Sequence, residues 1–362
     1  MIELIDISKT YPGSEVPAVD NFSLEIKEGE LVVLVGPSGC GKTTILKMIN
    51  RLIEPTSGTI AISGDPIDAV APHQLRRGIG YVIQQVGLFP HKTVGQNMTT
   101  VPELLDWSKA DIDSRRAELI ELVKLDPGFL DRYPSELSGG QRQRVGVARA
   151  LAADPPILLM DEPFAAVDPI VRAHLQDVLI ALQNRLHKTI VLVTHDIDEA
   201  IKLGDRIAIL SNGGHLEQYA PPREILRDPA NLFVADFLGT DRGIKRLSLI
   251  PVSAIDLDRG PVVQRGASAA EATAVTAKYG TDWFAVGSDT ELDGWASIAD
   301  LGVGGVDEVK LEPFRTLLSP ESTLKDALDA VVSSHTSVAA IFDGGRFLGM
   351  VTAEAISAEI LR

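Results

Sequence analysis

The chain has 362 residues, of which 45% are hydrophobic and 23% charged, and its formal net charge at pH 7 is -16. This composition is typical of folded globular proteins, and the length leaves room for two or three domains. The acidic balance argues against a general nucleic-acid binder and against direct docking on an anionic bilayer. A single cysteine, Cys40, excludes an internal disulfide framework and a multi-cysteine metal site.

The N-terminus carries no secretory signal pattern, because residues 1–6 alternate like a strand. The longest apolar runs, residues 31–35 and 157–160, are far shorter than a membrane span requires. We therefore expect a cytosolic protein whose contact with a membrane goes through a partner.

Three strands are predicted first, over residues 2–7, 22–26 and 31–35, and the third has the uniformly apolar pattern of a buried parallel strand. A phosphate loop follows the third strand and opens a helix, which is the context that makes G-x-x-x-x-G-K-[ST] specific. Its glycines let successive N–H groups point at one anion, Lys42 can reach the β- and γ-phosphates, and the Thr43 hydroxyl can ligate Mg²⁺. The motif comprises Gly36, Pro37, Ser38, Gly39, Cys40, Gly41, Lys42, Thr43 and Thr44.

Two further residues gain interest from this loop. Tyr11 follows the first strand, where an aromatic ring near the start of such an ATPase can stack on adenine; alone, it would more often be a packing residue. Gln84 ends a predicted strand over residues 79–83, where an amide can touch both a metal-bound water and a neighbouring mobile element.

Helical periodicity dominates residues 94–154, which indicates an α-helical insertion over about 92–154. It contains a second helix start suited to an anion, although a plain N-cap would have the same sequence. The residues of this start are Ser138, Gly139, Gly140 and Gln141, within Leu-Ser-Gly-Gly-Gln.

Two carboxylates end the buried strand at residues 157–160. An uncompensated buried pair is costly, so a cation is expected nearby. Asp161 suits Mg²⁺ through water, and Glu162 suits the general base that orients the attacking water. Asp168 closes the following loop, and His195 ends the buried strand 189–194, where it can hold the γ-phosphate and the lytic water.

These motifs, in this order, resemble the nucleotide-binding subunit of an ATP-binding cassette (ABC) transporter over about residues 1–240. The resemblance implies an α/β P-loop NTPase fold with an α-helical subdomain, ATP and Mg²⁺ as cofactors, and a nucleotide contact for Asp168. It also implies a homodimer that sandwiches ATP between the phosphate loop of one copy and Ser138–Gln141 of the other. The loop 84–91 and the helical subdomain would receive an integral membrane permease at the cytoplasmic face of the cell membrane.

An ungapped internal repeat fills the C-terminal part. Residues 268–272, 283–286 and 294–297 align with 323–327, 338–341 and 349–352, and each half indicates helix, strand, turn, strand, helix. This resembles an α+β tandem pair of cystathionine-β-synthase (CBS) domains, a Bateman module. We expect domains at 1–238, 251–305 and 306–362, with a linker at 239–250. Residues 294–300 fit the family's nucleotide-contacting element, whereas 349–355 lack its final acidic residue, so a regulatory nucleotide and a purely structural dimerisation role both stay open.

An ABC subunit with CBS domains resembles importers of glycine betaine, choline, carnitine and proline betaine, and residues 48–55 and 80–91 look like that subfamily. Such a complex includes an extracytoplasmic substrate-binding protein that acts through the permease. Two alternatives remain: an importer of another small solute such as an amino acid, and a soluble ABC ATPase acting on nucleic acid or the ribosome. The latter predicts fused ATPase halves or a basic arm, and this chain has neither.

Overall fold

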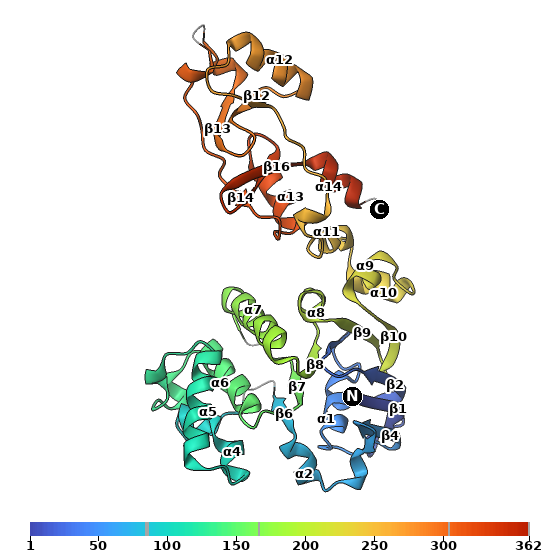
Figure 1. Ribbon diagram of the computed structural model, residues 1–362. Helices are drawn as coiled ribbons and strands as arrows, with labels where there is room; N and C mark the ends of the chain where they lie inside the picture. The colour runs from blue at the N-terminus through green and yellow to red at the C-terminus, as the bar shows by residue number, and fades with distance from the viewer. Residues whose placement is uncertain (84–86, 166, 303–304, 361–362) are drawn as a thin grey trace. The chain divides into compact units, whose positions relative to one another are not determined.

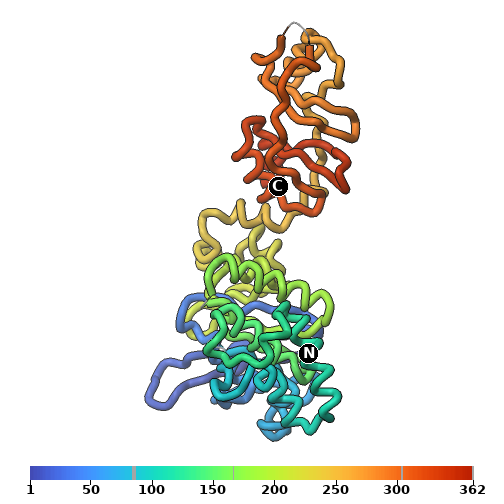
Figure 2. Tube along the Cα trace, turned by 90° about the vertical axis from the view of Figure 1, so that its left-hand side faces the viewer, coloured from blue at the N-terminus to red at the C-terminus, as the bar shows by residue number. Residues whose placement is uncertain are grey.

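The computed structural model describes residues 1–83, 87–165, 167–302 and 305–360. The chain divides into two compact units, Met1–Gly239 and Thr240–Arg362, each with its own core. The backbone of unit 1 runs from blue to yellow in Figure 2, and that of unit 2 from yellow to red. No described helix is both long and apolar enough to cross a membrane.

A six-stranded sheet forms the centre of unit 1, in the order β10-β9-β3-β8-β7-β6. Nearly all residues of strands β3, β7, β8 and β9 are buried, as expected where helices cover both faces of a sheet. The five strands other than β10 pair in parallel, so their carboxyl ends meet at one edge. The strands are β3 (Leu31–Val35), β6 (Ile79–Val82), β7 (Ile157–Asp161), β8 (Thr189–Thr194), β9 (Arg206–Ser211) and β10 (His215–Ala220).

An antiparallel sheet in the order β2-β1-β4-β5 completes the strand structure of unit 1. Its strands are β1 (Ile2–Lys9), β2 (Val19–Ile26), β4 (Ser57–Ile62) and β5 (Asp65–Pro66). Alternate residues of β2 are buried, and Phe22 and Ile26 enter one core with residues of β3 and of the helix that follows it. The strand predicted from residue 22 thus begins three residues earlier, at Val19.

The helical segment forms a group of its own, and α4, α5 and α6 gather apart from β1, β2 and β4 in Figure 1. Its helices are α3 (Val94–Met98), α4 (Thr100–Leu104), α5 (Lys109–Leu122) and α6 (Gly139–Leu151). The other helices of unit 1 are α1 (Lys42–Ile49), α2 (Pro72–Arg77), α7 (Pro169–Leu186), α8 (Ile197–Leu203), α9 (Pro222–Arg227) and α10 (Leu232–Leu238).

Unit 2 contains two similar three-stranded sheets, β11-β12-β13 and β14-β15-β16. In each, a short strand pairs in parallel with the next strand, which pairs antiparallel with the last. The sheets comprise β11 (Val262–Val263), β12 (Trp283–Gly287), β13 (Leu292–Ser297), β14 (Leu317–Leu318), β15 (Val338–Asp343) and β16 (Arg346–Thr352). The helices are α11 (Arg242–Leu247), α12 (Ala269–Tyr279), α13 (Leu324–Ser333) and α14 (Ala353–Ile360).

The two sheets pack against each other through alternate residues of their central strands. Phe284 and Val286 of β12 belong to the core beside α12, whereas Trp283 and Ala285 join Ala340 of β15 in a core between the sheets. Because successive side chains of a strand point to opposite faces, each central strand packs one face against the helix of its own repeat and the other face against the other repeat.

The structure differs from the predicted repeat at its first closing helix. The first repeat ends in a single 3₁₀ turn, Ile298–Asp300, whereas the second ends in α14. Glycines at 302, 304 and 305 follow the turn, and glycine is a poor helix former. The predicted linker 239–250 is also largely structured, because it contains α11, whose Leu247 is fully buried beside α13.

The leading segment of each repeat pairs with the last strand of the other. Asp258 forms a bridge with Met350 of β16, and Glu312 forms one with Trp295 of β13. Ile250 and Val252, although they precede the first repeat, lie in the core of the second. Neither repeat is therefore complete without the other.

Candidate functional site

The phosphate loop lies between β3 and α1, at the edge of the central sheet where the parallel strands end. Gly36 is buried, and a Cβ atom on it would clash with the Leu210 carbonyl. Gly41 has φ +108°, and a Cβ there would lie 2.6 Å from the Ala18 carbonyl oxygen. Both positions therefore require glycine for space, and Gly41 also for conformation. Ser38 and Gly39 are exposed, whereas Pro37 is half-buried.

The Lys42 side chain is folded into this loop and is only 5% exposed. Its ammonium donates hydrogen bonds to the carbonyl oxygens of Gly36 at 2.7 Å and Pro37 at 2.8 Å, and lies 3.7 Å from the Cys40 sulfur. The loop carbonyls therefore hold the lysine and keep its positive charge within the loop. This arrangement fits the binding of a phosphate.

Thr43 and Asp161 join the first turn of α1 to the end of β7. The Thr43 hydroxyl donates a hydrogen bond of 2.8 Å to the Asp161 carboxylate, which is 5% exposed. Burial raises the pKa of Asp161; the Thr43 hydrogen bond and the charge of Lys47 oppose the rise, whereas Glu162 adds to it. Burial and the Asp161 charge also raise the pKa of the nearby Tyr81 to about 12.

This pair fits Mg²⁺, because a hydroxyl and a carboxylate are the hard oxygen ligands that the ion accepts while it keeps several waters. A buried carboxylate whose charged form is disfavoured also gains from a cation. Among the residues that the structure describes, no group of three or more His, Cys, Asp or Glu could hold a metal.

Glu162 and His195 meet at the same edge. The His195 Nδ1 lies 3.3 Å from a carboxylate oxygen of Glu162. Glu162 has φ +44°, an uncommon conformation for a residue other than glycine, and its backbone N–H donates to the Val193 carbonyl at 2.9 Å. The hydrogen bond to the end of β8 therefore fixes the turn that carries the Glu162 carboxylate. The backbone at Glu162 is strained, and such strain is common at functional sites.

Tyr11 lies beside the phosphate loop. Its hydroxyl is 3.4 Å from the Thr44 hydroxyl, and the ring is 40% exposed. The Lys9 ammonium lies 5.6 Å from the ring centroid. An exposed aromatic ring held at this place can stack on a base.

Ser138 caps α6, and Gln141 completes a capping box with it: each side chain accepts a hydrogen bond from the other's backbone N–H. Asp168 caps α7 by accepting from Val171. A Cβ on Gly140 would clash with the Val171 side chain, so the two helix starts lie against each other. Ser138, Gly139 and Asp168 are exposed.

The structure does not bring these two helix starts to the phosphate loop of the same chain. In Figure 1 α6 lies beyond β6 and β7 from α1, and among the described residues no hydrogen bond joins 138–141 to 36–44. The predicted nucleotide contacts thus form two separate groups. Gln84, predicted for catalysis and metal binding, lies outside the described residues.

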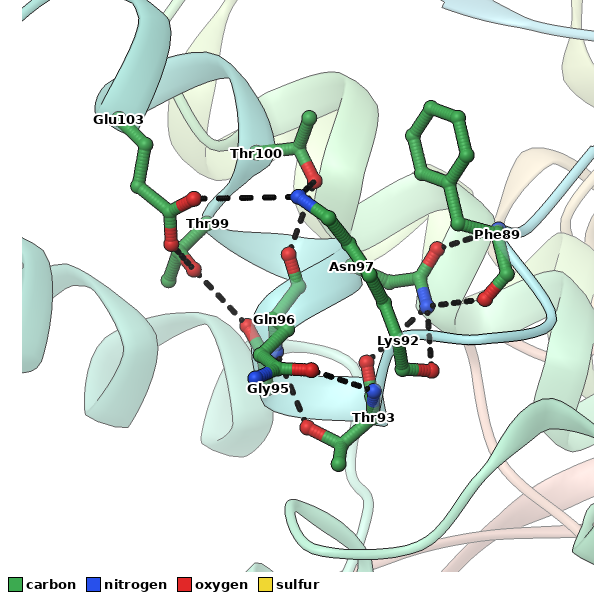
Figure 3. Close-up of polar contacts among 9 residues, drawn as sticks. All are labelled: Phe89, Lys92, Thr93, Gly95, Gln96, Asn97, Thr99, Thr100 and Glu103. Carbon is green, nitrogen blue, oxygen red and sulfur yellow. Dashed lines mark hydrogen bonds and ion pairs between the residues drawn. The ribbon is translucent and has the colours of Figure 1, made fainter.

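Sequence reasoning missed Asn97, which organises the segment before α3 (Figure 3). Its fully buried amide accepts from the Phe89 N–H at 2.7 Å and donates to three carbonyls, those of Phe89, Lys92 and Thr93, at 3.0 to 3.1 Å. Around it, Lys92 contacts Thr100 and Glu103. The capping box of Thr93 with Gln96 could have located the start of the helix. No local sequence signal indicates that the Asn97 side chain is buried and bonded to several backbone groups.

A second missed residue, Arg149, links α6 to this segment. Its guanidinium donates to the Gly87 carbonyl at 2.7 Å and lies 5.8 Å from the centre of the Phe89 ring. Burial lowers the pKa of Arg149. The helix that begins at Ser138 therefore contacts, near its other end, the segment that follows Gln84.

The comparisons with known proteins agree with this site. The ABC transporter family profile matches residues 19–165. The osmoprotectant import ATP-binding protein OsmV of Salmonella typhimurium is 45% identical over 370 residues, covering 99% of this chain and 95% of that protein. The glycine betaine/carnitine/choline transport ATP-binding protein OpuCA of Bacillus subtilis is 57% identical over 245 residues, covering 68% of this chain and 64% of that protein.

A solved structure of the ATP-binding cassette MJ0796, a dimer in a post-hydrolysis state bound to ADP and Pi, is also similar. It is 37% identical, has a TM-score of 0.56, and the match covers 61% of this chain and 99% of that one. The match is to a nucleotide-bound cassette, which agrees with a phosphate loop at the edge of the central sheet. The chain therefore belongs to the ABC transporter ATPases, within the family of ATP-binding proteins of osmoprotectant importers.

Proposed function

We propose that this chain hydrolyses ATP to drive the uptake of quaternary ammonium osmolytes, namely glycine betaine, choline, carnitine or proline betaine. The observation that carries the proposal is the likeness to an osmoprotectant import protein over 99% of the chain. The site supports it, because groups suited to phosphate, metal and water activation meet at one sheet edge.

We propose the following roles for the site residues. Lys42 and the N–H groups of 36–44 bind the phosphates, and Tyr11 stacks on the base. Thr43 and Asp161, with Gln84, hold Mg²⁺, which would neutralise phosphate charge when bound. Glu162 accepts the proton of the attacking water, and His195, 3.3 Å from it, orients that carboxylate and contacts the γ-phosphate.

The second helix start is proposed to act on another copy of the chain. Ser138, Gly139, Gly140, Gln141 and Asp168 form no hydrogen bond with the phosphate loop of their own chain among the described residues, and Ser138, Gly139 and Asp168 are exposed. In a head-to-tail homodimer they would close the ATP site of the partner. The dimeric cassette among the similar structures supports this arrangement.

We propose that the dimer works at the cytoplasmic face of the cell membrane, bound to integral permease subunits that receive solute from an extracytoplasmic binding protein. The segment ordered by Asn97 and Arg149 lies directly after Gln84 and exposes the Phe89 ring, which suits it to touch both the ATP site and a permease.

Unit 2 is proposed to be a tandem CBS module that regulates transport. Its two sheets share strand order and register irregularities 55 positions apart, between Val286 and Gly287 and between Ile341 and Phe342. The nucleotide contact at 294–300 stays a prediction: Ser297 caps the 3₁₀ turn, and Asp300 is exposed. A chain ending at Gly239 should keep ATP hydrolysis and lose regulation of uptake; regulation like that of the full chain would contradict the module's role.

The test of the main proposal is uptake into vesicles that carry the full complex, with labelled glycine betaine, choline and carnitine at several salt concentrations. A matched complex with Glu162→Gln provides the background. We expect ATP-dependent uptake of at least one quaternary amine by the unaltered complex only. Uptake of an amino acid and of no quaternary amine would overturn the proposed cargo, and retention of the chain on RNA rather than membranes would overturn transport.

A further inference from the structure

Unit 2 contains a cleft of about 480 Å³ between its two repeats, which we call the repeat cleft. The first repeat contributes Trp295 of β13; the second contributes the segment before β14 and the end of α13 with the loop that follows. Its volume lies within the range of small-molecule sites. The lining residues that matter here are Trp295, Glu312, Phe314, Arg315, Ser334 and His335.

Three aromatic rings line the repeat cleft. The Trp295 and His335 ring centroids are 6.3 Å apart, and the planes are tilted by 34°. Phe314 is held by an edge contact with Trp283, at 6.4 Å between centroids. Trp295 is only partly buried, so part of its indole is available to a ligand. Faces of aromatic rings attract cations, and tryptophan does so most strongly.

Glu312 lies directly opposite Trp295 on a neighbouring segment. Trp295 donates its backbone N–H to the Glu312 carbonyl at 2.9 Å, and Glu312 donates back at 2.8 Å. Residues directly opposite in an antiparallel bridge send their side chains to the same face. The present partner of the Glu312 carboxylate is Lys310, at 3.2 Å, whose side chain is 89% exposed and can readily be exchanged for another cation.

The part of the repeat cleft around Glu312 and the carboxyl end of α13 favours a cation. The carboxyl end of α13 lines it through Ser333 and Ser334, and that end of a helix carries partial negative charge. The stretch 282–312, which supplies Trp295 and Glu312, holds eight carboxylates and one basic residue, Lys310. Of these carboxylates Glu312 lines the cleft, so an organic cation would be attracted to this part of it.

Arg315 adds one positive group to the lining. It is exposed, and the structure gives it no hydrogen bond or ion pair within the described residues. A guanidinium in this position can bind a ligand carboxylate. Aromatic rings, the Glu312 carboxylate and the Arg315 guanidinium all line this cleft, and together they match a molecule with a methylated ammonium at one end and a carboxylate at the other.

We propose that the repeat cleft binds a quaternary ammonium zwitterion of the glycine betaine or carnitine class, with its methylated ammonium against Trp295 and Glu312 and its carboxylate on Arg315. The binding rests on the cleft alone. The regulatory meaning of this binding rests on the proposed function. The imported solute would bind the regulatory unit of its own ATPase, so that transport would respond to the solute concentration inside the cell.

The test is equilibrium dialysis of the full chain, without nucleotide, against labelled glycine betaine. Choline lacks the carboxylate, and 3,3-dimethylbutanoate has nearly the same shape as glycine betaine without the cationic nitrogen. We expect glycine betaine to bind, choline to bind more weakly, and 3,3-dimethylbutanoate not to compete. Trp295→Leu should weaken glycine betaine binding about tenfold, the size of a good cation–π contact.

Matched variants separate the two ends of the ligand. Glu312→Gln should weaken both glycine betaine and choline about threefold, as expected for a partly exposed ion pair. Arg315→Gln should weaken glycine betaine and leave choline unchanged. The controls Glu308→Gln and Arg346→Gln remove the same charges from exposed positions outside the cleft lining and should change neither.

Failure to bind glycine betaine or carnitine overturns the proposal, as does binding that Trp295→Leu and Glu312→Gln both leave unchanged. Binding of an adenine nucleotide in the cleft, lost in Trp295→Leu, with no binding of either zwitterion also overturns it. Vesicle uptake is a separate readout. Uptake of glycine betaine by a chain that binds none in unit 2 would leave the proposed function standing, whereas binding without uptake of any quaternary amine would defeat only that function.

Discussion

The Thr43 hydroxyl donates a hydrogen bond of 2.8 Å to the Asp161 carboxylate, so residues 118 positions apart meet at one sheet edge. The bond links the helix that follows the phosphate loop to the strand that carries both acidic residues. It also supports a carboxylate whose charged form is disfavoured by burial.

Asp161→Asn should stabilise the chain in the absence of nucleotide and Mg²⁺ while it abolishes hydrolysis. Because burial raises the folded-state pKa of Asp161, its ionised form costs stability above that pKa, and the cost disappears as the pH falls and the group is protonated. We therefore expect Tm to rise by about 1–3 °C at pH 7 and the difference to shrink at acidic pH.

Scanning calorimetry of the two chains at pH 7 and at an acidic pH measures the difference in Tm. Thr43→Val is the matched variant: it removes the hydroxyl that supports the carboxylate, so its Tm at pH 7 should fall. A lower Tm for Asp161→Asn at pH 7 would contradict the cost that we attribute to this carboxylate.

Lys42→Ala should abolish ATP binding. The ammonium is held by the carbonyls of Gly36 and Pro37, so the substitution removes the positive charge that the loop carries for binding phosphate. Binding of a fluorescent ATP analogue measures the effect, and the rise in Tm on addition of ATP should vanish with it. Lys109→Ala, an exposed lysine of α5, is the control, and equal ATP affinity of the two variants would exclude the assigned role.

Glu162→Gln should reduce hydrolysis to background and keep ATP affinity. The amide preserves the size of the side chain and cannot accept the proton of the attacking water. Phosphate release measures turnover, and size-exclusion chromatography with light scattering measures the ATP-bound dimer that should accumulate. Turnover at the rate of the unaltered chain would remove Glu162 as the base.

Asn97→Leu should lower the free energy of unfolding by about 2–4 kcal/mol, because the Phe89 N–H and the Lys92 carbonyl lose the amide that they bond, while the Phe89 and Thr93 carbonyls each keep one backbone partner. Denaturant titration measures the loss. Gln96→Ala, an exposed neighbour, should cost about 1 kcal/mol or less. Because Asn97 orders the segment after Gln84, uptake should fall further than ATP hydrolysis, so that less solute is carried per ATP. An equal fall in uptake and hydrolysis would limit Asn97 to stability.

Much of this protein can be predicted from the sequence, because its signals are local. Gly36 to Thr44 is a continuous motif between a buried strand and a helix, and the caps Ser138 and Asp168 each act within three residues of themselves. The internal repeat is also visible, because its two halves keep one spacing over helix and strands alike. Each of these features depends on residues that are near neighbours along the chain.

Only the tertiary structure reveals the contacts between distant segments. Nothing in the sequence around Asn97 predicts its four hydrogen bonds, and nothing near Trp295 predicts that Glu312 will lie opposite it. Such pairings depend on how strands are ordered and on which segments cross between repeats, and these are decided by the burial of whole sheets rather than by local propensity. The sequence by itself thus determined the nucleotide chemistry of unit 1, and the tertiary structure decided the repeat cleft of unit 2.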